Sequence, residues 1–475
     1  MPLSVVLDGN GKFRIDSLYF SKPVLQAERM VSELPGGYTT FGEAASVFRK
    51  GIFDIKADSY VDDGVPFVRI SNLKNGLIND TDIAYITEEA HRKEQNTALV
   101  YGDIVLSKTA YAAASFVNLS RCNVSQDTVA VRIKTEWQDK LKSAFVVSYL
   151  NSRYGNQLLM RQFQGNVQMH LSLPDGEMVK LPLISGVFQL AIEKTFLNSF
   201  QQAKDADKFY ARAEQILLQA LQLDTWQPSE PNTYESTFAQ VSTAERFDAE
   251  YFQPKYATLV AHVKANAPGD LLRNLATLID HGKQPPYVDD GEALVFSQKY
   301  IGRTSIDYNF VNDEDITHTS LDFAKANPDY VLHYGDVVHY SVGAYLGRAQ
   351  AFLEKEPLAM PGSFITLIRA DKAKVNSIYL SIVMNSMVGQ MQSVKHKSAS
   401  AQPYIYPKDI RGFWIPLLPD ATQDAIAQLV VDAHHARARA KSLLDVAKRA
   451  VEVAIEHGEA AGLALLSAAR TEGPE

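Results

Sequence analysis

Residues 188–224 read FQLAIEKTFLNSFQQAKDADKFYARAEQILLQALQLD, and this stretch decides how the rest of the chain is arranged. Small and apolar residues recur in it at alternating spacings of four and three, the pattern of a long helix that packs lengthwise against another helix. At about 1.5 Å per residue such a helix spans about 50 Å, so the stretch predicts a rigid spacer. The seam consists of Ile192, Phe196, Ser199, Ala203, Ala206, Tyr210, Ala213, Leu217 and Ala220.

A second seam with the same spacing lies near the end of the chain, at a constant offset of 234 from the first (426 minus 192). Its single charged residue is Arg437, whose long side chain we expect to extend into solvent. The two helices are therefore predicted to pack on each other. The alternative is that each seam is buried in a globular core of its own. The second seam consists of Ile426, Val430, Ala433, Arg437, Ala440, Leu444, Ala447, Val451 and Ala454.

The segments before the two helices also repeat each other. RIDSLYFSKP at 14–23 returns as RFDAEYFQP at 246–254, and YGDIV at 101–105 returns as YGDVV at 334–338. The dipeptide NS at 151 recurs at 385, and LPL at 181 recurs as IPL at 415. Four pairs in the same order, at offsets of 232 to 234, indicate an internal duplication.

We therefore predict an α+β chain with two similar globular domains, separated by two long helices. In the first domain, residues 65–70, 103–107, 128–133 and 179–183 are expected to form strands, and residues 145–163 a helix. Because the linker is short, the second helix must run back along the first, so the helices are expected to be antiparallel with a pseudo-twofold axis. The predicted boundaries are 1–187 (first domain), 188–224 (helix), 225–245 (irregular linker), 246–420 (second domain), 421–458 (helix) and 459–475 (tail).

Composition sets limits on the function. The chain has 475 residues, 46% of them apolar and 21% charged, which is typical of a globular protein with more than one domain. Its single cysteine, Cys122, excludes an internal disulfide and a four-cysteine zinc site. No signal-peptide pattern or membrane-spanning apolar run is seen, so we expect a cytoplasmic protein without membrane contact. The net charge of -8 argues against nucleic-acid binding over the whole surface but allows local basic grooves.

Two similar domains held apart by a rigid spacer suit the recognition of two short DNA sequences. With a rise of about 3.4 Å per base pair, the spacer would separate two reading domains by roughly 15 base pairs, and a twofold axis matches the dyad of the duplex. Asn and Gln can pair with adenine, Arg and Lys with guanine, and the basic residues also hold phosphates. For each candidate residue the alternative is an ordinary solvated surface group.

The candidate DNA-binding residues cluster at similar places in both copies but differ in identity. In the first copy they are Lys50, Arg69, Asn72, Lys74, Lys108, Tyr111, Arg161, Gln164, Asn166, Gln168 and His170. In the second copy they are Lys283, Gln298, Lys299, Arg303, Tyr340, Ser341, Tyr345, Arg348, Lys395, Lys397 and Gln402.

Four strings, in this order and duplicated, resemble the specificity subunit of Type I restriction-modification systems: GVPFVRISNL at 64–73, YGDIVLS at 101–107, RFDAEYFQPK at 246–255 and IPLLP at 415–419. The resemblance covers residues 14–457. One departure is LPLISG at 181–186, which lacks the second proline that the family has here and that IPLLP at 415–419 keeps. It implies a non-catalytic subunit that binds double-stranded DNA at a bipartite site. It also implies two adenine-N6 methyltransferase subunits and restriction-translocase subunits as partners. S-adenosylmethionine would then be bound by the methyltransferase, and this chain would hold no cofactor.

Other functions fit less well. QPPY at 284–287 is close to the Asp/Asn-Pro-Pro-Tyr element of amino-methyltransferases, but glutamine is the longer side chain and no glycine-rich loop precedes it. PDGE at 174–177 is closer to a turn than to a nuclease carboxylate pair, and no Walker-type phosphate loop is present. His434 and His435 would point about 100° apart on a helix, which is poor geometry for a shared metal. The remaining alternative is a non-catalytic coiled-coil scaffold that binds proteins at its ends.

Overall fold

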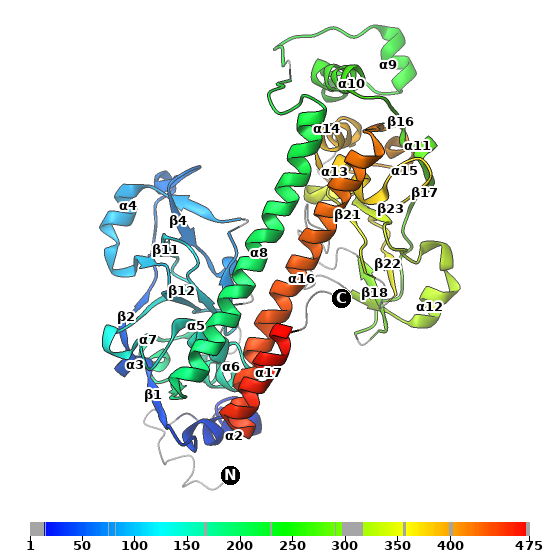
Figure 1. The fold of residues 1–475 in the computed structure, drawn as a ribbon. Coiled ribbons are helices and arrows are strands. Elements are labelled where there is room, and N and C mark those ends of the chain that lie inside the picture. Colours follow the sequence, from blue (N-terminus) through cyan, green and yellow to red (C-terminus); the bar gives the residue numbers. More distant parts are fainter. Residues whose placement is uncertain are drawn as a thin grey trace. The chain divides into compact units, whose positions relative to one another are not determined.

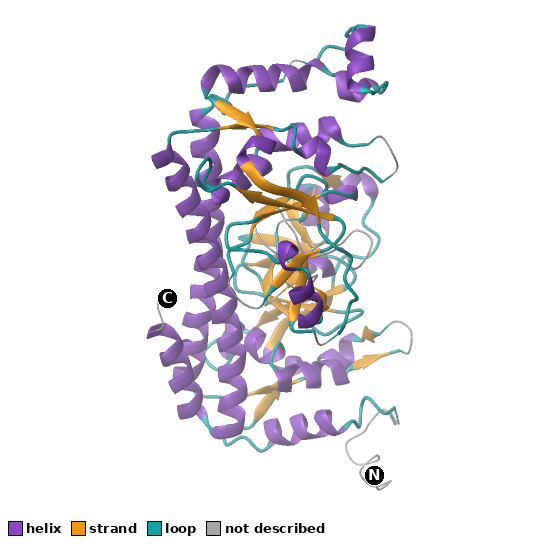
Figure 2. Cartoon of the chain, turned by 90° about the vertical axis from the view of Figure 1, so that its right-hand side faces the viewer, coloured by secondary structure: helices purple, strands orange, loops and turns teal. Residues whose placement is uncertain are grey.

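The structure is a computed structural model that describes residues 14, 16–74, 76–80, 82–165, 169–228, 230–289, 291–296, 317–354, 358–398 and 402–471. The chain divides into two compact units. Unit 1 comprises Met1–Lys204 with Arg437–Glu475, and unit 2 comprises Asp205–Ala436. Both units mix helices and strands, coloured purple and orange in Figure 2. The two longest described helices, α8 (Gly186–Ala220) and α16 (Asp420–His457), each contribute one part to each unit (Figure 1).

Unit 1 contains two main sheets. The first has the strand order β2 (Ala45–Lys50), β12 (Thr128–Ile133), β9 (Ile104–Ser107), β10 (Ala114–Phe116), β6 (Leu77–Ile78), β5 (Leu73–Lys74). The second has the order β3 (Tyr60–Val61), β7 (Ala84–Ile86), β4 (Val65–Val68), β11 (Arg121–Val124), β8 (Leu99–Val100). A short antiparallel pair, β1 (Tyr38–Thr40) and β15 (Lys180–Pro182), joins the beginning of the domain to its end.

The two faces of the first sheet have different partners, and the alternation of side chains along its strands explains why. Ile104 and Leu106 of β9 share a core with the helices α2 (Lys22–Ser32), α5 (Ser143–Leu150) and α6 (Arg153–Arg161). Val105, between them, shares a second core with the other sheet. Because successive strand residues point to opposite faces, an all-apolar strand such as β9 must be covered on both sides.

Unit 2 repeats this arrangement. Its larger sheet has the order β17 (Ala276–His281), β23 (Ile365–Ala370), β20 (Val337–Tyr340), β21 (Ala349–Ala351), which matches β2, β12, β9, β10. Its smaller sheet has the order β19 (Thr317–Thr319), β18 (Ala293–Phe296), β22 (Ala359–Pro361), which matches β7, β4, β11. The pair β16 (Gly269–Leu271) and β24 (Trp414–Pro416) matches β1 and β15, and the parallel pairing of β18 with β22 matches that of β4 with β11.

The sequence repeat extends to individual hydrogen bonds. The Gln189 side chain accepts from the backbone N–H of Lys142 (2.9 Å) and donates to the carbonyl of Ile184 (2.9 Å). In unit 2, Gln423 makes the same two bonds, with Asn376 (3.0 Å) and Leu418 (2.8 Å). All three positions keep the offset of 234 that relates the helical seams (423 minus 189, 376 minus 142, 418 minus 184).

The start of each copy is fixed in the same way. Arg14 donates to the backbone carbonyls of Arg161 and Phe163 at 2.9 and 3.1 Å. Arg246 donates to those of His396 and Lys397 at 3.2 and 2.9 Å. In each copy, the arginine that begins the matching string therefore attaches the first segment to the chain at the end of one helix. This helix is the one that ends at Arg161 in unit 1 and at His396 in unit 2.

The predicted helix over residues 145–163 is wrong in one respect, because it is two helices. Asn151 bonds the backbone of Ala114 in both directions (3.1 and 2.7 Å), and the hydroxyl of Ser152 caps α6 by accepting from the backbone N–H of Gly155. The same break separates α13 (Ser377–Asn385) from α14 (Met387–His396) in unit 2, again at an Asn-Ser pair. Since asparagine and serine favour turns and caps, the repeated dipeptide marks a helix break.

The two helical seams are buried within the units. In unit 1, Ile192 and Phe196 of α8 share one core with Leu444 and Val451 of α16. In unit 2, Tyr210 and Leu217 share a core with Ile426 and Val430. Ala203 is partly buried, the seam residue Ala220 is exposed, and Arg437 is exposed as expected. In each unit the two helices therefore share one core, as predicted. The same core also contains residues of the sheet and the other helices, as in the alternative of burial in a globular core.

In unit 1 the first part of α8 and the last part of α16 run in opposite directions. Ser185, just before α8, donates its backbone N–H to the carboxylate of Glu459, just after α16, at 3.0 Å. The residues after α16, for which the sequence predicted no element, form the helix α17 (Glu459–Thr471). Its Leu466 is buried, and Gly462 lies so close to Phe188 that an added Cβ would come within 2.7 Å of the ring.

The linker is also more regular than expected, because it contains α9 (Phe238–Ala244), capped by Thr237 and Gln240. A capping box of this kind is readable from sequence only once a helix is suspected, and α9 buries no residue. Within the described ranges, no helix is long and apolar enough to cross a membrane.

Candidate nucleic-acid interface

In unit 1, several predicted residues meet at one edge of the six-stranded sheet. Lys50, the last residue of β2, is paired with Val129, and Ser107, the last residue of β9, is paired with Thr128. The loop after β9 then begins with Lys108, whose backbone N–H donates to the carbonyl of Asp127 at 2.8 Å. Because these strands are antiparallel neighbours, the ends of β2 and β9 and the start of β12 lie side by side.

A hairpin lies at the same edge, beside the ends of β2 and β9 and the start of β12. It consists of β13 (Phe163–Gln164) and β14 (His170–Leu171), and His170 forms a bridge with Thr109. The backbone N–H of Leu171 donates to the carbonyl of Lys108 at 2.8 Å. We name the group Lys50, Lys108, Asp127 and His170 the unit 1 edge.

The unit 1 edge is cationic. Burial lowers the pKa of Lys108, the charge of Lys50 lowers it further, and Asp127 opposes both effects. As far as the structure describes the chain, neither lysine is within ion-pair distance of a carboxylate. The Lys50 ammonium lies 4.4 Å from the ring centre of Phe53, which is 69% exposed. Two lysines without ion pairs and an exposed aromatic ring are suited to bind a phosphate and stack on a base.

The backbone of these loops is held in an uncommon conformation. Asp54 and Ala110 have φ angles of 59° and 65°, in the left-handed region that non-glycine residues rarely adopt. Ala110 is tied to the hairpin through a hydrogen bond from its N–H to the carbonyl of Met169 (3.1 Å). Such strain persists where surrounding contacts determine the loop, and it is commonly found at binding sites.

Unit 2 has the same backbone frame at the same edge. The N–H of Gly282 donates to Ile365 as that of Gly51 does to Thr128, and the N–H of Ser341 donates to Phe364 as that of Lys108 does to Asp127. Val342 forms a bridge with Tyr404, as Thr109 does with His170. The residues equivalent to Lys50, Lys108, Asp127 and His170 are therefore His281, Ser341, Phe364 and Tyr404, which we name the unit 2 edge.

The side chains of the unit 2 edge are neutral, and all except Ser341 are aromatic. Phe364 is 40% exposed, and Tyr406, whose ring centre lies 4.5 Å from that of Tyr404, is 51% exposed. The nearest predicted cation in sequence is Lys283, which donates to the side chain of Asn327 at 2.9 Å and lies 5.0 Å from the ring centre of Tyr330. One frame thus carries two chemically different surfaces.

A glycine follows β2 in unit 1 and β17 in unit 2, and the backbone around it leaves no space for a side chain. A Cβ on Gly51 would come within 2.2 Å of the carbonyl oxygen of Ser125, and one on Gly282 within 2.0 Å of that of Pro361. We expect Gly51→Ala and Gly282→Ala each to lower the free energy of unfolding by about 1–3 kcal/mol, since a backbone strand must move. Urea unfolding measures this. Gly186→Ala, whose Cβ would meet nothing within 4 Å, is the control, and equal stability of all three variants would contradict the shared frame.

Several predicted DNA-binding residues are buried and serve the fold, so we no longer propose them as DNA contacts. Asn72 bonds the backbone of Arg69 and Asn79, and Arg161 is paired with Glu28 at 2.6 Å. Tyr340 and Ser341 lie in the interior of unit 2. Burial removes these side chains from any ligand at the surface.

The other predicted residues have varied settings. Arg69 is paired with Asp82, Gln164 donates to Asp175 at 2.8 Å, and Tyr111 is exposed and donates to the carbonyl of Ile70 at 3.0 Å. Arg348 lies over the ring of Tyr345, and Lys395 over that of Tyr251. Lys397 is partly buried and Gln402 is exposed. The backbone of Lys74 belongs to β5, and the candidates Asn166, Gln168, Gln298, Lys299 and Arg303 lie outside the described residues.

Asp127, Phe364 and Tyr404 are not among the DNA-binding residues predicted from the sequence. Tyr404 follows His170 at an offset of 234 (404 minus 170), the same as that of the helical seams, so this offset would have identified it. Phe364 follows Asp127 at an offset of 237 (364 minus 127), because loops of different length intervene, and no single offset would have paired them.

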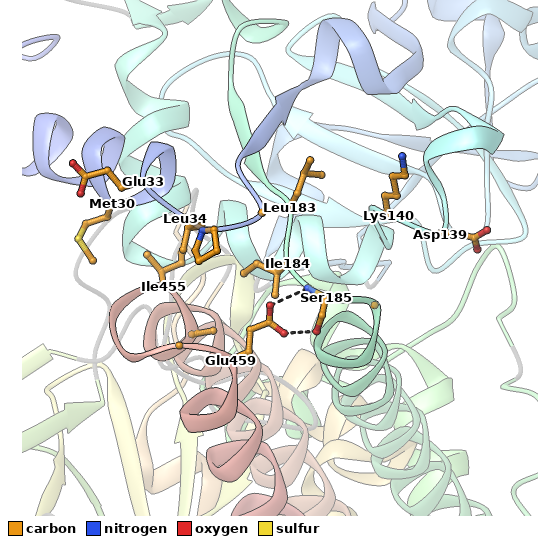
Figure 3. Close-up of a pocket in the computed structure, with 15 residues that line it drawn as sticks. Met30, Glu33, Leu34, Asp139, Lys140, Leu183, Ile184, Ser185, Ile455 and Glu459 are labelled. Atoms are coloured by element: carbon orange, nitrogen blue, oxygen red, sulfur yellow. Dashed lines mark hydrogen bonds between the residues drawn. The ribbon is translucent and has the colours of Figure 1, made fainter.

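Unit 1 also contains a cavity of about 860 Å³, lined by the end of α2, the start of α8 and the end of α16 (Figure 3). The carboxylate of Glu459 accepts from both the backbone N–H and the hydroxyl of Ser185 at its wall. None of the residues of the unit 1 edge lines this cavity. In the described part of the chain, no three His, Cys, Asp or Glu side chains are grouped to hold a metal ion, and His434 instead contacts Glu354 at 2.9 Å.

No protein-family model matches the chain. No curated protein matches it either. Among solved structures, the chain is similar to the S subunit of a Type-I restriction-modification system from M. genitalium, with 11% identity over 91% of this chain and 95% of that chain and a TM-score of 0.41.

Two further structures are similar at lower scores. One comes from work on complex assembly and conformational transition of the type I R-M system, with 14% identity, 92% and 98% coverage and a TM-score of 0.28. The other is the HsdS subunit from Thermoanaerobacter tengcongensis, with 15% identity, 92% and 96% coverage and a TM-score of 0.27.

Proposed function

We propose that the chain is the non-catalytic DNA-recognition subunit of a Type I restriction-modification complex, in which unit 1 and unit 2 each read one half of a bipartite site. One observation carries the proposal: the same backbone frame presents different side chains in the two units. Lys50 and His170 of the unit 1 edge are replaced by His281 and Tyr404 in the unit 2 edge, and the place of Lys108 is taken by the buried Ser341. Two copies of an enzyme would keep their reacting groups, whereas two readers of different sequences must keep the frame and change the side chains.

The long helices would set the distance between the half-sites. A helix of 35 residues, the length of α8, spans about 50 Å, which corresponds to roughly 15 base pairs of duplex. In this proposal the two helices are antiparallel over their whole length, related by a pseudo-twofold axis, and the target sequence is bipartite for that reason. The proposed surroundings are the cytoplasm.

The exposed outer faces of the helices would dock the partners. The proposed partners are two adenine-N6 methyltransferase subunits, which would bring S-adenosylmethionine, and the restriction-translocase subunits. Exposed aromatic residues outside the two edges also favour protein contacts, because Phe238 and Phe247 are 79% and 84% exposed. A protein-binding scaffold without DNA recognition would use the same surfaces, so the two functions are separated by DNA binding alone.

The test is a binding selection from a duplex library with randomised positions, using the full chain together with its methyltransferase partner. We expect enrichment of two short sequences with a constant gap, and an affinity that falls steeply as salt rises. A complex that assembles normally but enriches no sequence would refute DNA recognition and leave the scaffold function.

A further inference from the structure

A chain of hydrogen-bonding side chains runs from the unit 2 edge into the interior of unit 2. The Tyr404 hydroxyl lies 2.5 Å from Nε2 of His281, and Nδ1 of His281 lies 3.2 Å from Oγ1 of Thr366. Thr366 and Ser341 are joined at 2.8 Å, and Oγ of Ser341 lies 3.3 Å from the carbonyl oxygen of His339. Thr366, Ser341 and His339 are buried, while His281 and Tyr404 are partly exposed.

Both histidines of this region are neutral at physiological pH. Burial lowers the pKa of His281, although the charge of Asp280 opposes the shift. Burial lowers the pKa of His339 to about 3, helped by the neighbouring His281. A neutral imidazole has one N–H donor and one bare nitrogen that accepts, so the direction of each hydrogen bond is set by where the single proton lies.

The chemistry of the pair at the surface end sets this direction. A phenol O–H is a far stronger acid than a neutral imidazole N–H, and the bare imidazole nitrogen is a good acceptor. The Tyr404 hydroxyl therefore donates to Nε2 of His281. His281 then carries its own proton on Nδ1 and donates it to Thr366.

The remaining bonds follow in sequence. Oγ1 of Thr366 accepts the proton of His281, so the Thr366 hydroxyl donates its own proton to Oγ of Ser341. Ser341 in turn donates to the carbonyl oxygen of His339 at 3.3 Å, and its hydroxyl oxygen also lies 3.4 Å from Nδ1 of His339. With the direction set by Tyr404 and His281, each hydroxyl of the chain donates one hydrogen bond, and the single proton of Tyr404 is directed inward.

We propose that Tyr404 is a specificity-determining residue of unit 2: its oxygen can only accept, and it selects a base with an amino group in the major groove, adenine or cytosine. His281 and Thr366 are positioning residues that hold the tyrosine proton inward. The inference rests on the proposed function. Adenine N6 and cytosine N4 are the amino donors displayed in the major groove, whereas guanine and thymine present acceptors there.

The unit 1 edge has no tyrosine and histidine at the places of Tyr404 and His281, so it lacks the inward-directed hydroxyl. Lys50 occupies the place of His281, and an ammonium can only donate. His170 occupies the place of Tyr404. The two edges therefore differ in hydrogen-bonding character, and a substitution in the unit 2 edge leaves the half-site read by unit 1 unchanged.

The experiment compares the wild-type complex with Tyr404→Phe, Thr366→Val and the control Tyr406→Phe in the same duplex selection. Tyr404→Phe removes only the hydroxyl. We expect it to lose base preference at one position of one half-site, to bind the wild-type target about three- to tenfold more weakly, and to keep the other half-site. Thr366→Val should show the same loss in part, and Tyr406→Phe should show none. Thermal unfolding of each variant checks that the fold is retained.

A base analogue separates a specific contact from general destabilisation. At the affected position the target base is replaced by an analogue without the amino group, such as purine in place of adenine. The wild-type complex should lose about three- to tenfold in affinity, and Tyr404→Phe should lose nothing. An equal loss in both proteins, or an unchanged preference in Tyr404→Phe, would overturn the inference while leaving the proposed function intact. A wild-type complex that selects no sequence would refute the proposed function itself.

Discussion

Replacing Asp336 by alanine is expected to lower the free energy of unfolding by about 3–5 kcal/mol, because it leaves the charge of Arg369 without its partner in the interior of unit 2. The buried Asp336 carboxylate accepts from Nε and Nη2 of Arg369 at 3.1 and 2.8 Å and from the backbone N–H of His333 at 2.8 Å. Urea unfolding followed by circular dichroism measures the effect. Glu89→Ala, which removes the exposed partner of Lys93, is the control and should leave the midpoint unchanged.

The same pair exists in unit 1 and provides an internal comparison. Asp103 accepts from Nε of Arg132 at 3.0 Å and from the backbone N–H of Val100 at 2.8 Å. The Arg132 side chain is 36% exposed against 21% for Arg369, so solvent compensates its charge better. Asp103→Ala should therefore lower the free energy of unfolding by less than Asp336→Ala does. If Asp336→Ala were as mild as Glu89→Ala, the pair would have no role in holding the sheet.

Reversing the charge of Lys50 and Lys108 together is expected to weaken DNA binding at least tenfold for every duplex sequence. Each lysine that neutralises a phosphate contributes about 0.9 to the slope of log affinity against log salt, so the slope should fall in magnitude by about 1.8 in Lys50→Glu/Lys108→Glu. Titrations at several salt concentrations measure both quantities.

A charge-matched control is available on the same unit. Lys93→Glu with Lys448→Glu makes the same change in net charge, but both lysines are already paired, with Glu89 and Asp445, outside the unit 1 edge. It should leave the salt slope near that of the wild-type protein. Equal slopes for the two double variants would show that the unit 1 edge does not contact the phosphate backbone.

The long helices were predictable because a helical seam is a local signal. The predicted ranges 188–224 and 421–458 differ from α8 and α16 by at most four residues at each end. The break between α5 and α6 was missed because it depends on Asn151 bonding Ala114, which lies 37 residues away. The helix α17 was missed because its packing against Phe188 involves a residue from another part of the chain.

The candidate site was only partly predictable, since polar residues look the same in sequence whether they face solvent or a buried partner. Lys50, Lys108 and His170 were predicted because basic and polar residues cluster at similar places in the two copies. Arg161 was misplaced because its partner, Glu28, comes from a distant part of the chain, near its beginning. Ser341 is buried and bonds Thr366, which lies 25 residues away, so the local sequence does not reveal its burial.

Sequencing the DNA methylation of cells that carry the chain with its methyltransferase partner tests the central proposal most directly. We expect methylation at a bipartite motif with a constant gap, and we expect this methylation to disappear when the chain is removed. Tyr404→Phe should alter one half of the motif and leave the other half unchanged. A continuous motif, or a motif whose two halves both change with a substitution in one unit, would contradict the account.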